Sequence, residues 1–271
     1  MSLKYGLIAA GQGSRLVAEG ITDPKPLVKV GGETLIGRLI RLFCENDAES
    51  VSIIINEEMT QVYDFLKSIK LSVPLNIVVK TTPDSFQSFC ELQPFLQDDK
   101  SKICLTTVDP IFHDQELAAY VHHFMSDDVD DALMGVTDYI DDEKPLYVKT
   151  SNGDLRIIGY ANESYPGCRY ISGGIYCMNQ QALSLLPTAR QEGVKRMRGF
   201  QQYLVDAGLH VQAWPFTKII DIDHAADIDK ALQFLSKCRI FIASQESVGL
   251  LFILLIVLIK MGISSWLCFN I

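Results

Sequence analysis

The sequence has too little positive charge for a broad nucleic-acid-binding face. Its 24 Lys and Arg residues are outnumbered by 33 Asp and Glu residues, which gives a formal net charge of −9. A protein that grips nucleic-acid phosphates over a wide surface needs clustered Lys and Arg. We therefore expect no nucleic-acid partner. Small anionic ligands are still allowed, because a few local cations and backbone N–H groups are enough to hold them.

The sequence also lacks a C-x-x-C pair. Its seven cysteines are scattered: Cys44, Cys90, Cys104, Cys168, Cys177, Cys238 and Cys268. An odd number without paired spacing is typical of reduced thiols and argues against a disulfide framework or a zinc site. We therefore expect a cytoplasmic protein. The apolar run at residues 5–10 ends in a glycine loop, so it is interpreted as a first strand and not as a signal peptide.

No internal repeat or low-complexity linker divides the chain, and 271 residues with 48% hydrophobic content suit one main domain, which we place at residues 1–240. Short apolar runs predict strands at 5–10, 51–55, 75–79 and 102–108. Apolar residues at helical spacing predict helices between them, at 33–46, 57–69 and 84–96. This alternating order predicts an α/β fold, in which helices cover both faces of a mainly parallel sheet and ligands bind at the carboxyl ends of the strands.

The second half of the chain predicts a different pattern, with shorter connections, so that the sheet as a whole is mixed. Strands are predicted at 132–137, 145–150, 155–160 and 169–178, followed by helices near 180–186 and 194–207. A strand pair is predicted at 210–216 and 218–223, before a last helix. The acidic stretches 127–131 and 141–143 are expected to be solvated loop faces.

A glycine-rich loop follows the first strand. It reads Ala9, Ala10, Gly11, Gln12, Gly13, Ser14, Arg15. With so few side chains in the way, successive backbone N–H groups can face a bound anion. The loop is no Rossmann fingerprint, because Leu16 stands where a third glycine is needed, and it lacks the spacing of a Walker A loop. A glycine turn without a ligand is the alternative interpretation.

One lysine is held between two prolines, at Pro24-Lys25-Pro26. Proline fixes its own backbone and restricts the residue before it. The side chain of Lys25 is therefore aimed in a set direction at little cost in entropy, which suits a cation that must meet an anionic ligand.

Together these two segments resemble a known family. The combination of G-x-G-S-R, P-K-P-L and V-x-G-x-x-L-I within residues 7–36 is similar to the signature of the nucleotidyltransferases that activate sugar phosphates, which have a GT-A-like, Rossmann-like α/β fold. The resemblance covers roughly residues 3–238. It implies that the glycine loop and Arg15 bind a nucleoside triphosphate, and that Lys25 contacts the phosphates where the new bond forms.

Chemistry between two anionic phosphates needs a divalent metal, and Mg²⁺ prefers carboxylate and phosphate oxygens. The family places one aspartate after the fourth strand, which here is Asp109; the alternative role for Asp109 is a cap for the next helix. A second aspartate is expected late in the domain. Asp221 and Asp223 both qualify, and Asp223 is favoured.

Two further segments match the family more loosely. Ser85, Gln87 and Ser88 occupy the positions where the family contacts the nucleobase. A helix start capped by Asp84 is the alternative explanation of these residues. The strand at 170–178 resembles the family strand beside the acceptor, which makes Ser172, Gly173 and Gly174 candidates for acceptor binding. Lys149 is a further candidate, for the acceptor phosphate. Its alternative role is that of a surface lysine. The Glu-Lys-Pro motif of many sugar-nucleotide synthases is missing from residues 157–167, which argues against common hexose acceptors.

The C-terminal segment 241–271 lies outside the resemblance. Residues 248–259 are all apolar, Lys260 follows, and a mixed stretch with two serines continues to 269. A spanning helix needs about 20 mainly apolar residues. Residues 248–269 therefore predict a membrane-associated helix, with a partner-binding or core helix, or an aberrant tail, as alternatives.

The resemblance thus predicts an enzyme that joins a nucleoside monophosphate from a nucleoside triphosphate to a phosphorylated acceptor such as a sugar 1-phosphate, releasing pyrophosphate, with Mg²⁺ as cofactor. One alternative is a cytidylyltransferase for an aminoalcohol phosphate such as phosphocholine. Another is a nucleotide-binding regulatory protein without catalysis. The sequence predicts neither the nucleobase nor the oligomeric state.

Overall fold

The computed structural model describes residues 2–151 and 153–236. The chain divides into two compact units, Met1–Ala231 and Leu232–Ile271. The first unit contains the whole sheet and every helix given below except the last, which begins in it at residue 225. The second contributes only residues 232–236 to the described part, and these are helical. The predicted tail 241–271 lies outside the described residues, so the predicted boundary at 240 stays a prediction.

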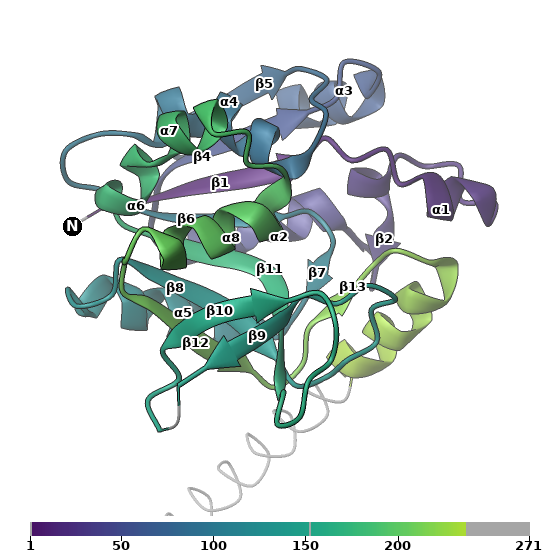
Figure 1. Ribbon diagram of the computed structural model, residues 1–271. Coiled ribbons are helices and arrows are strands. Elements are labelled where there is room, and N and C mark those ends of the chain that lie inside the picture. The colour runs from purple at the N-terminus through teal and green to yellow at the C-terminus, as the bar shows by residue number, and fades with distance from the viewer. Residues whose placement is uncertain (1, 152, 237–271) are drawn as a thin grey trace, which may run out of the picture. The chain divides into compact units, whose positions relative to one another are not determined.

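Within the described residues, nine strands form one mixed sheet (Figure 1). Its main path runs β10-β9-β11-β6-β1-β4-β5, and β8 joins β11 to β12. The strands are β1 Leu3–Ala9, β4 Ala48–Ile55, β5 Leu75–Val79, β6 Lys102–Thr107, β8 Ala132–Thr137, β9 Tyr147–Thr150, β10 Ile157–Ala161, β11 Tyr170–Met178 and β12 Val211–Phe216. Strands β5, β4, β1 and β6 are parallel, as are β8 and β12. Antiparallel pairing centres on β11, which contacts β6, β8 and β9.

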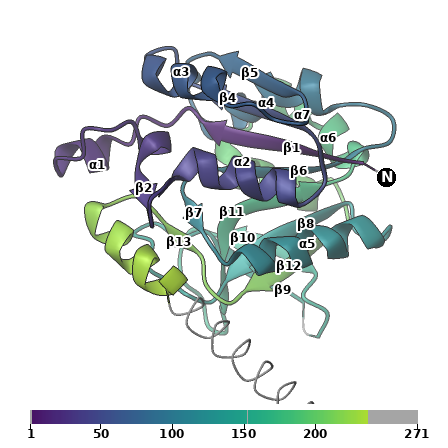
Figure 2. The same cartoon turned by 180° about the vertical axis from the view of Figure 1, so that it is seen from behind.

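Helices cover both faces of this sheet. Their bounds are α1 Ser14–Ala18, α2 Leu35–Glu45, α3 Thr60–Ser68, α4 Ser85–Leu96, α5 Asp114–Ser126, α6 Gln180–Ser184, α7 Leu186–Gln191 and α8 Arg196–Asp206, with a 3-10 helix, η1, at Lys25–Leu27 and a last helix from residue 225. Helix α8 lies in front of the sheet in Figure 1, whereas α2 and α5 lie in front in the reverse view of Figure 2. The predicted α/β fold with a mixed, mainly parallel sheet is confirmed.

The core on the α4–α8 face is dominated by aromatic packing. Phe86 and Phe89 of α4 are fully buried, and their rings lie 5.2 and 5.9 Å from the ring of Phe200 in α8. On the other face, α2 begins after Thr34, whose Oγ1 accepts a hydrogen bond from the backbone N–H of Gly37 and so satisfies an unpaired helix donor. These anchored helices hold the ends of the strands in fixed positions.

The segments 210–216 and 218–223 both contain strands, but the prediction that they pair with each other is wrong. Strand β12 pairs with β8, while β13 (Ile220–Asp221) pairs antiparallel with β7 (Pro110–Ile111). After β12 the backbone N–H of Thr217 donates to the Glu116 carboxylate of α5. The chain therefore leaves β12 toward α5 and does not fold back on it. A further two-stranded piece joins β2 (Lys29–Val30) to β3 (Glu33–Thr34).

The small β7–β13 ladder brings late residues to the carboxyl end of β6. Asp221 is the register partner of Pro110, and the N–H of Ile222 donates to the carbonyl of Asp109. The carboxyl ends of β1, β4 and β6 lie side by side, because these strands are parallel neighbours. The loops that follow them therefore meet at one edge of the sheet.

Candidate active site

The glycine loop after β1 has a backbone that requires glycine at position 13. Gly13 has φ +63°, in the left-handed region, and precedes α1. A Cβ atom added there would lie 2.8 Å from the Cβ of Lys25, a contact too close for a side chain. Around Gly11, by contrast, no atom lies within 4 Å of such a Cβ. Gly13 thus lets the loop pass directly over the lysine.

Lys25 is buried, with 7% of its surface exposed, and its ammonium is paired twice. Its Nζ atom donates to Oδ2 of Asp109 and to Oδ1 of Asp223, each at 2.7 Å. Burial alone would lower the pKa of Lys25, but the two carboxylates outweigh that effect and raise its pKa above the ordinary value. Lys25 therefore stays charged at neutral pH.

Asp223 joins the two predicted catalytic cations. Its other oxygen, Oδ2, accepts a hydrogen bond from Nη1 of Arg15 at 2.8 Å. Arg15 lies on α1 just beyond the glycine loop, while Asp223 lies just beyond β13. The structure therefore brings the glycine-loop arginine, the lysine between prolines and two of the predicted metal ligands into one hydrogen-bonded group.

The third predicted carboxylate, Asp221, is in a different environment. Its Oδ1 atom is buried and has no hydrogen-bond partner among the described residues. Burial and then the nearby charge of Asp109 raise the pKa of Asp221 well above its usual range. For Asp109, burial acts in the same direction, but the charge of Lys25 prevails and lowers its pKa. Two neighbouring carboxyls thus differ because only Asp109 contacts the ammonium.

These carboxylates fit a divalent cation. The buried oxygen of Asp221 has no donor, and an unpaired buried polar atom is costly unless something binds it. Mg²⁺ uses one or two protein carboxylates together with phosphate oxygens and water. Asp109 and Asp223 already share one cation, the ammonium of Lys25, and Asp221 adds an unsatisfied oxygen. The set suits Mg²⁺, and both late aspartates stay candidates for the second ligand.

A cavity of about 700 Å³ opens above the glycine loop. The predicted site residues that line it are Ala10, Gly11, Gln12, Gly13, Ser14, Arg15, Lys25, Ser85, Ser88, Asp109 and Asp223. Ala9 and Gln87 are not among its lining residues; Ala9 is fully buried in β1. The loop, the lysine and the start of α4 thus surround a single space.

The predicted nucleobase contacts already have internal partners. Asp84 caps α4 by accepting from the N–H groups of Phe86 and Gln87, which confirms the capping interpretation of these letters. The hydroxyl of Ser85 accepts from the N–H of Met197, and that of Ser88 lies 2.6 Å from Oγ1 of Thr82. Ser85 and Ser88 still line the cavity, so capping and nucleobase contact are compatible.

Sequence reasoning missed Asn56 and Thr81, which also line this cavity. Asn56 follows β4 directly and is buried, and its Oδ1 accepts from Oγ1 of Thr81 and from the N–H of Glu58. A buried polar residue directly after an apolar parallel strand was the signal that could have found it, because such strands carry ligand sites at their carboxyl ends.

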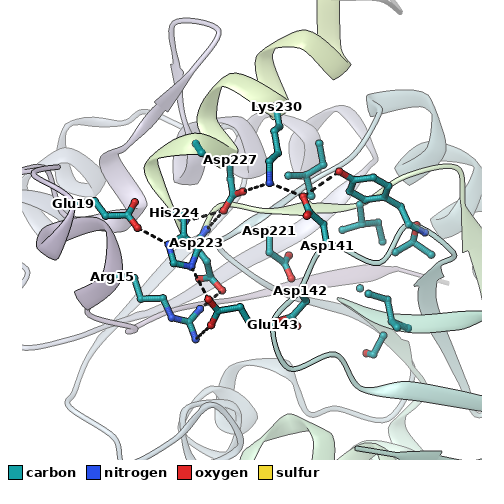
Figure 3. Close-up of a pocket in the computed structure, with 18 residues that line it drawn as sticks. Arg15, Glu19, Asp141, Asp142, Glu143, Asp221, Asp223, His224, Asp227 and Lys230 are labelled. Atoms are coloured by element: carbon teal, nitrogen blue, oxygen red, sulfur yellow. Dashed lines mark hydrogen bonds and ion pairs between the residues drawn. The ribbon is translucent and has the colours of Figure 1, made fainter. Parts of the chain in front are cut away.

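A second cavity, of about 560 Å³, adjoins the first, and Arg15 and Asp223 line both (Figure 3). Ser172 and Gly173 of β11 line it, as predicted for the acceptor site. Gly174 does not, but it has φ +74°, and a Cβ there would lie 2.8 Å from Oγ1 of Thr107. Lys149 is exposed and also lies outside the lining; its ammonium is 5.6 Å from the ring centre of Tyr165.

The two acidic stretches are more than solvated faces. Asp141, Asp142 and Glu143 are exposed, yet all three line the second cavity. In the other stretch, 127–131, the carboxylate of Asp130 is buried, and Nδ1 of His210 lies 2.6 Å from its Oδ1. The prediction of solvated loops is therefore wrong for Asp130.

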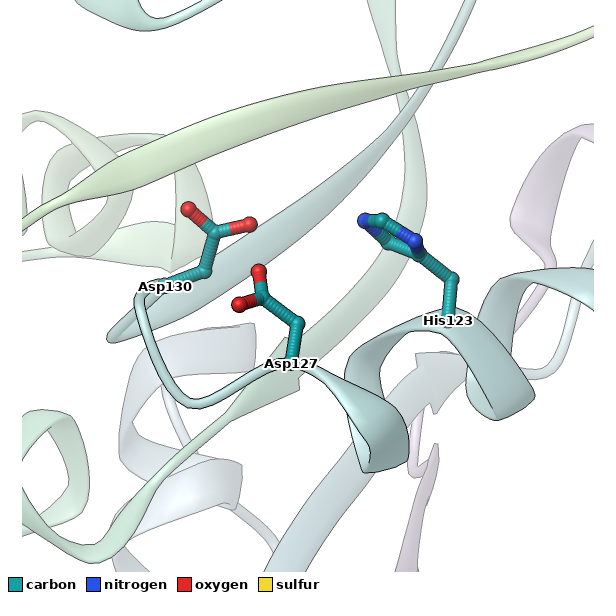
Figure 4. Close-up of side chains that lie close together, drawn as sticks. All are labelled: His123, Asp127 and Asp130. Carbon is teal, nitrogen blue, oxygen red and sulfur yellow. The ribbon is translucent and has the colours of Figure 1, made fainter.

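Asp130 also belongs to a second group of ligand atoms, with His123 and Asp127 (Figure 4). The three donor atoms lie within 4.8 Å of one another. This group precedes β8, which runs in the same direction as β6, so it lies at the opposite edge of the sheet from Asp109. It has no part in the site described above.

Known proteins are similar to this chain at the level of family and fold. A family model described as Nucleotidyl transferase matches residues 6–219. No curated protein sequence matches the chain. Among the described residues, no helix is long and apolar enough to cross a membrane.

Solved structures share the fold at low sequence identity. The inositol-1-phosphate CTP transferase from T. maritima has 20% identity and a TM-score of 0.69, covering 86% of this chain and 97% of its own. A Bacillus anthracis protein assigned as a glucose-1-phosphate thymidylyltransferase, in complex with a sucrose, has 21% identity and a TM-score of 0.73, with 86% and 95% covered. A nucleoside-diphosphate-sugar pyrophosphorylase from Vibrio cholerae RC9 has 18% identity and a TM-score of 0.64, with 84% and 99% covered.

Proposed function

The chain belongs to the nucleotidyl transferase family, and from that premise we propose that it transfers a nucleoside monophosphate from a nucleoside triphosphate to a small phosphate monoester. An oxygen of the acceptor phosphate attacks the α-phosphorus, a new P–O bond forms, and the bond to the β-phosphate breaks. Pyrophosphate leaves with the bonding electrons. The attacking phosphate is already ionised at neutral pH, so no protein nucleophile or general base is needed.

The observation that carries this proposal is the position of Lys25. One buried ammonium bridges Asp109 and Asp223, and Asp223 in turn contacts Arg15, which lines both cavities. A triphosphate in the first cavity and an acceptor in the second would meet beside these cations. Preorganised positive charge of this kind stabilises the charge that develops on the transferring phosphates.

In this proposal the first cavity holds the triphosphate against the backbone of the glycine loop and Arg15. Asn56, Ser85 and Ser88 also line this cavity and offer polar groups to a base or ribose. The second cavity takes the acceptor beside Ser172 and Gly173. Asp109, with Asp223 or Asp221, would hold Mg²⁺. When bound, the ion neutralises phosphate charge and orients the reacting groups.

A nucleotide sensor is the rival, and the site argues against it. A sensor needs the triphosphate cavity but neither a buried lysine held by two carboxylates nor a second cavity that meets the first.

The scattered free thiols, of which Cys90, Cys104 and Cys177 are buried, support a cytoplasmic location for the reaction.

The test is pyrophosphate release from each of the four ribonucleoside triphosphates with a panel of phosphorylated acceptors and Mg²⁺. The proposal expects release that requires both substrates. Binding of a triphosphate without release under any pairing would support the sensor.

A further inference from the structure

A group of metal-ligating side chains lies at the opposite edge of the sheet from the proposed active site. It consists of His123, near the end of α5, and of Asp127 and Asp130 in the loop between α5 and β8. One ligand atom from each residue lies within 4.8 Å of the other two, and Figure 4 shows the His123 ring facing the two carboxylates. Ligand atoms of a tetrahedral zinc site lie about 3.3 Å apart, so side-chain shifts of about 1 Å would bring these three onto one ion.

Asp130 is the buried member of the group. Its side chain is only 5% exposed, and Nδ1 of His210 lies 2.6 Å from its Oδ1. Burial raises the pKa of Asp130, because the contact with His210 offsets only part of the cost of desolvating the charge. The carboxyl groups of Asp127 and Asp130 are also close enough to share a hydrogen bond. Two carboxylates in contact repel each other unless a proton or a cation lies between them, so the group is short of positive charge.

In the described part of the chain, no lysine or arginine supplies that charge through an ion pair. The ammonium of Lys102 donates to the backbone carbonyls of Phe124 and Asp127 and to Oδ1 of Asp128. Its charge acts on Asp127 without a direct ion pair to that carboxylate. The space between the two carboxylates is therefore suited to a cation from solution.

His123 adds a nitrogen ligand whose orientation is fixed. Its ring packs against the indole of Trp214 in β12, with ring centres 4.6 Å apart. The hydrogen bonds that His123 forms with described residues use its backbone carbonyl, which accepts from Oγ of Ser126 and from the N–H of Asp127. The ring nitrogens are thus left for a ligand. Imidazole beside carboxylates suits Zn²⁺, whereas Mg²⁺ prefers oxygen ligands alone.

We propose that His123, Asp127 and Asp130 bind a Zn²⁺ ion, with water completing its coordination. His210 is the outer partner that orients the Asp130 carboxylate. The donor set contains no cysteine, so it differs from the thiolate sites that the cysteine spacing argues against. Because the ion would bind the folded chain and join α5 to the loop before β8, it would stabilise the native state. The inference does not depend on the proposed transfer reaction.

The test is Zn²⁺ binding to the full chain, with Zn²⁺ alone as the probe and excess Mg²⁺ present to compete for the carboxylates of the proposed active site. Isothermal titration calorimetry measures Kd. His123→Ala and Asp127→Asn should each weaken binding about 100-fold or more, and His210→Ala about tenfold, because loss of an outer partner alone typically costs 10- to 100-fold. Wild-type Tm should rise by about 5 °C or more when free Zn²⁺ exceeds Kd a hundredfold.

Sequence neighbours supply the matched controls. His122→Ala and Asp128→Asn change the same residue types at exposed positions outside the group, and both should keep the wild-type Kd. Circular dichroism before metal addition checks each fold. If His123→Ala does not fold, the comparison of Asp127→Asn with Asp128→Asn carries the test, since asparagine keeps the size of the side chain.

Three results would overturn the inference. The first is a wild-type chain that does not bind Zn²⁺. The second is a Kd that is the same in the group variants as in their neighbouring controls. The third is a thiolate charge-transfer band when Co²⁺ replaces Zn²⁺, because that band would assign the metal to cysteines. A Co²⁺ spectrum with nitrogen and oxygen ligands only, lost in His123→Ala, is the result that we expect.

Discussion

The Nζ atom of Lys25 lies 2.7 Å from Oδ1 of Asp223, although 198 residues separate the two in the sequence. The contact joins the first loops of the domain to one of its last segments. It forms because η1 points the lysine inward and the β7–β13 ladder returns the late segment to the end of β6. The proposed chemistry depends on this closure.

Lys25→Ala should lower kcat by roughly 10² or more, because the lost ammonium would act on charge that develops at the transferring phosphates. The measurement is pyrophosphate release at saturating substrates, with circular dichroism to confirm the fold. Lys29→Ala, at an exposed lysine of β2, is the matched control and should keep full turnover. Wild-type kcat in the Lys25→Ala enzyme would remove this residue from the mechanism.

The carboxylates should separate by role. Asp109→Asn and Asp223→Asn should each abolish Mg²⁺-dependent turnover, since both approach the same cation position around Lys25. Asp221→Asn should have the milder effect, because Asp223 contacts the ammonium of Lys25 whereas the Oδ1 atom of Asp221 has no partner among the described residues. Titrating Mg²⁺ against the rate distinguishes them. An inactive Asp221→Asn enzyme beside an active Asp223→Asn enzyme would reverse our choice of the second ligand.

Gly13→Ala should lower the free energy of unfolding by about 1 to 3 kcal/mol, because φ +63° strains any other residue and the new methyl meets Lys25. Urea unfolding measures this. Gly11→Ala is the control at the same loop: nothing lies within 4 Å of its Cβ, and we expect a change below about 0.5 kcal/mol. Equal stability of the two variants would mean that the close passage over Lys25 is not a constraint.

A chain that ends at Ser244 should stay folded and keep its turnover. All the residues assigned to chemistry lie within the unit Met1–Ala231. The apolar run 248–259 should instead be responsible for any association of the full chain with membranes or partners, because apolar patches of that size seldom stay uncovered. Gel filtration with and without detergent, together with pyrophosphate release, tests this. Loss of turnover in the shortened chain would place the tail in the core.

Local sequence patterns predicted the parallel half of the fold and the first half of the site. Each of these signals spans only a few consecutive residues. They are the apolar runs that form β1, β4, β5 and β6, and the two prolines that flank Lys25. Strand pairing in the second half could not be predicted in this way. Strands β12 and β13 each pair with a strand more than 70 residues away, and no local pattern specifies that partner. The role of the acidic loop at 141–143 was hidden for the same reason, because it depends on which loops meet. Asn56, in contrast, had a local signal, its position directly after the apolar strand β4.

The location of a radioactive label tests the central claim most directly. The enzyme is incubated with Mg²⁺, the acceptor panel and the preferred nucleoside triphosphate, labelled either at the α-phosphorus or at the γ-phosphorus, and the products are separated by chromatography. Nucleotidyl transfer predicts that the α label enters a new acceptor-linked product while the γ label leaves in pyrophosphate, at equal rates. A γ label on the acceptor or in free phosphate, or no transfer of the α label, would contradict the account.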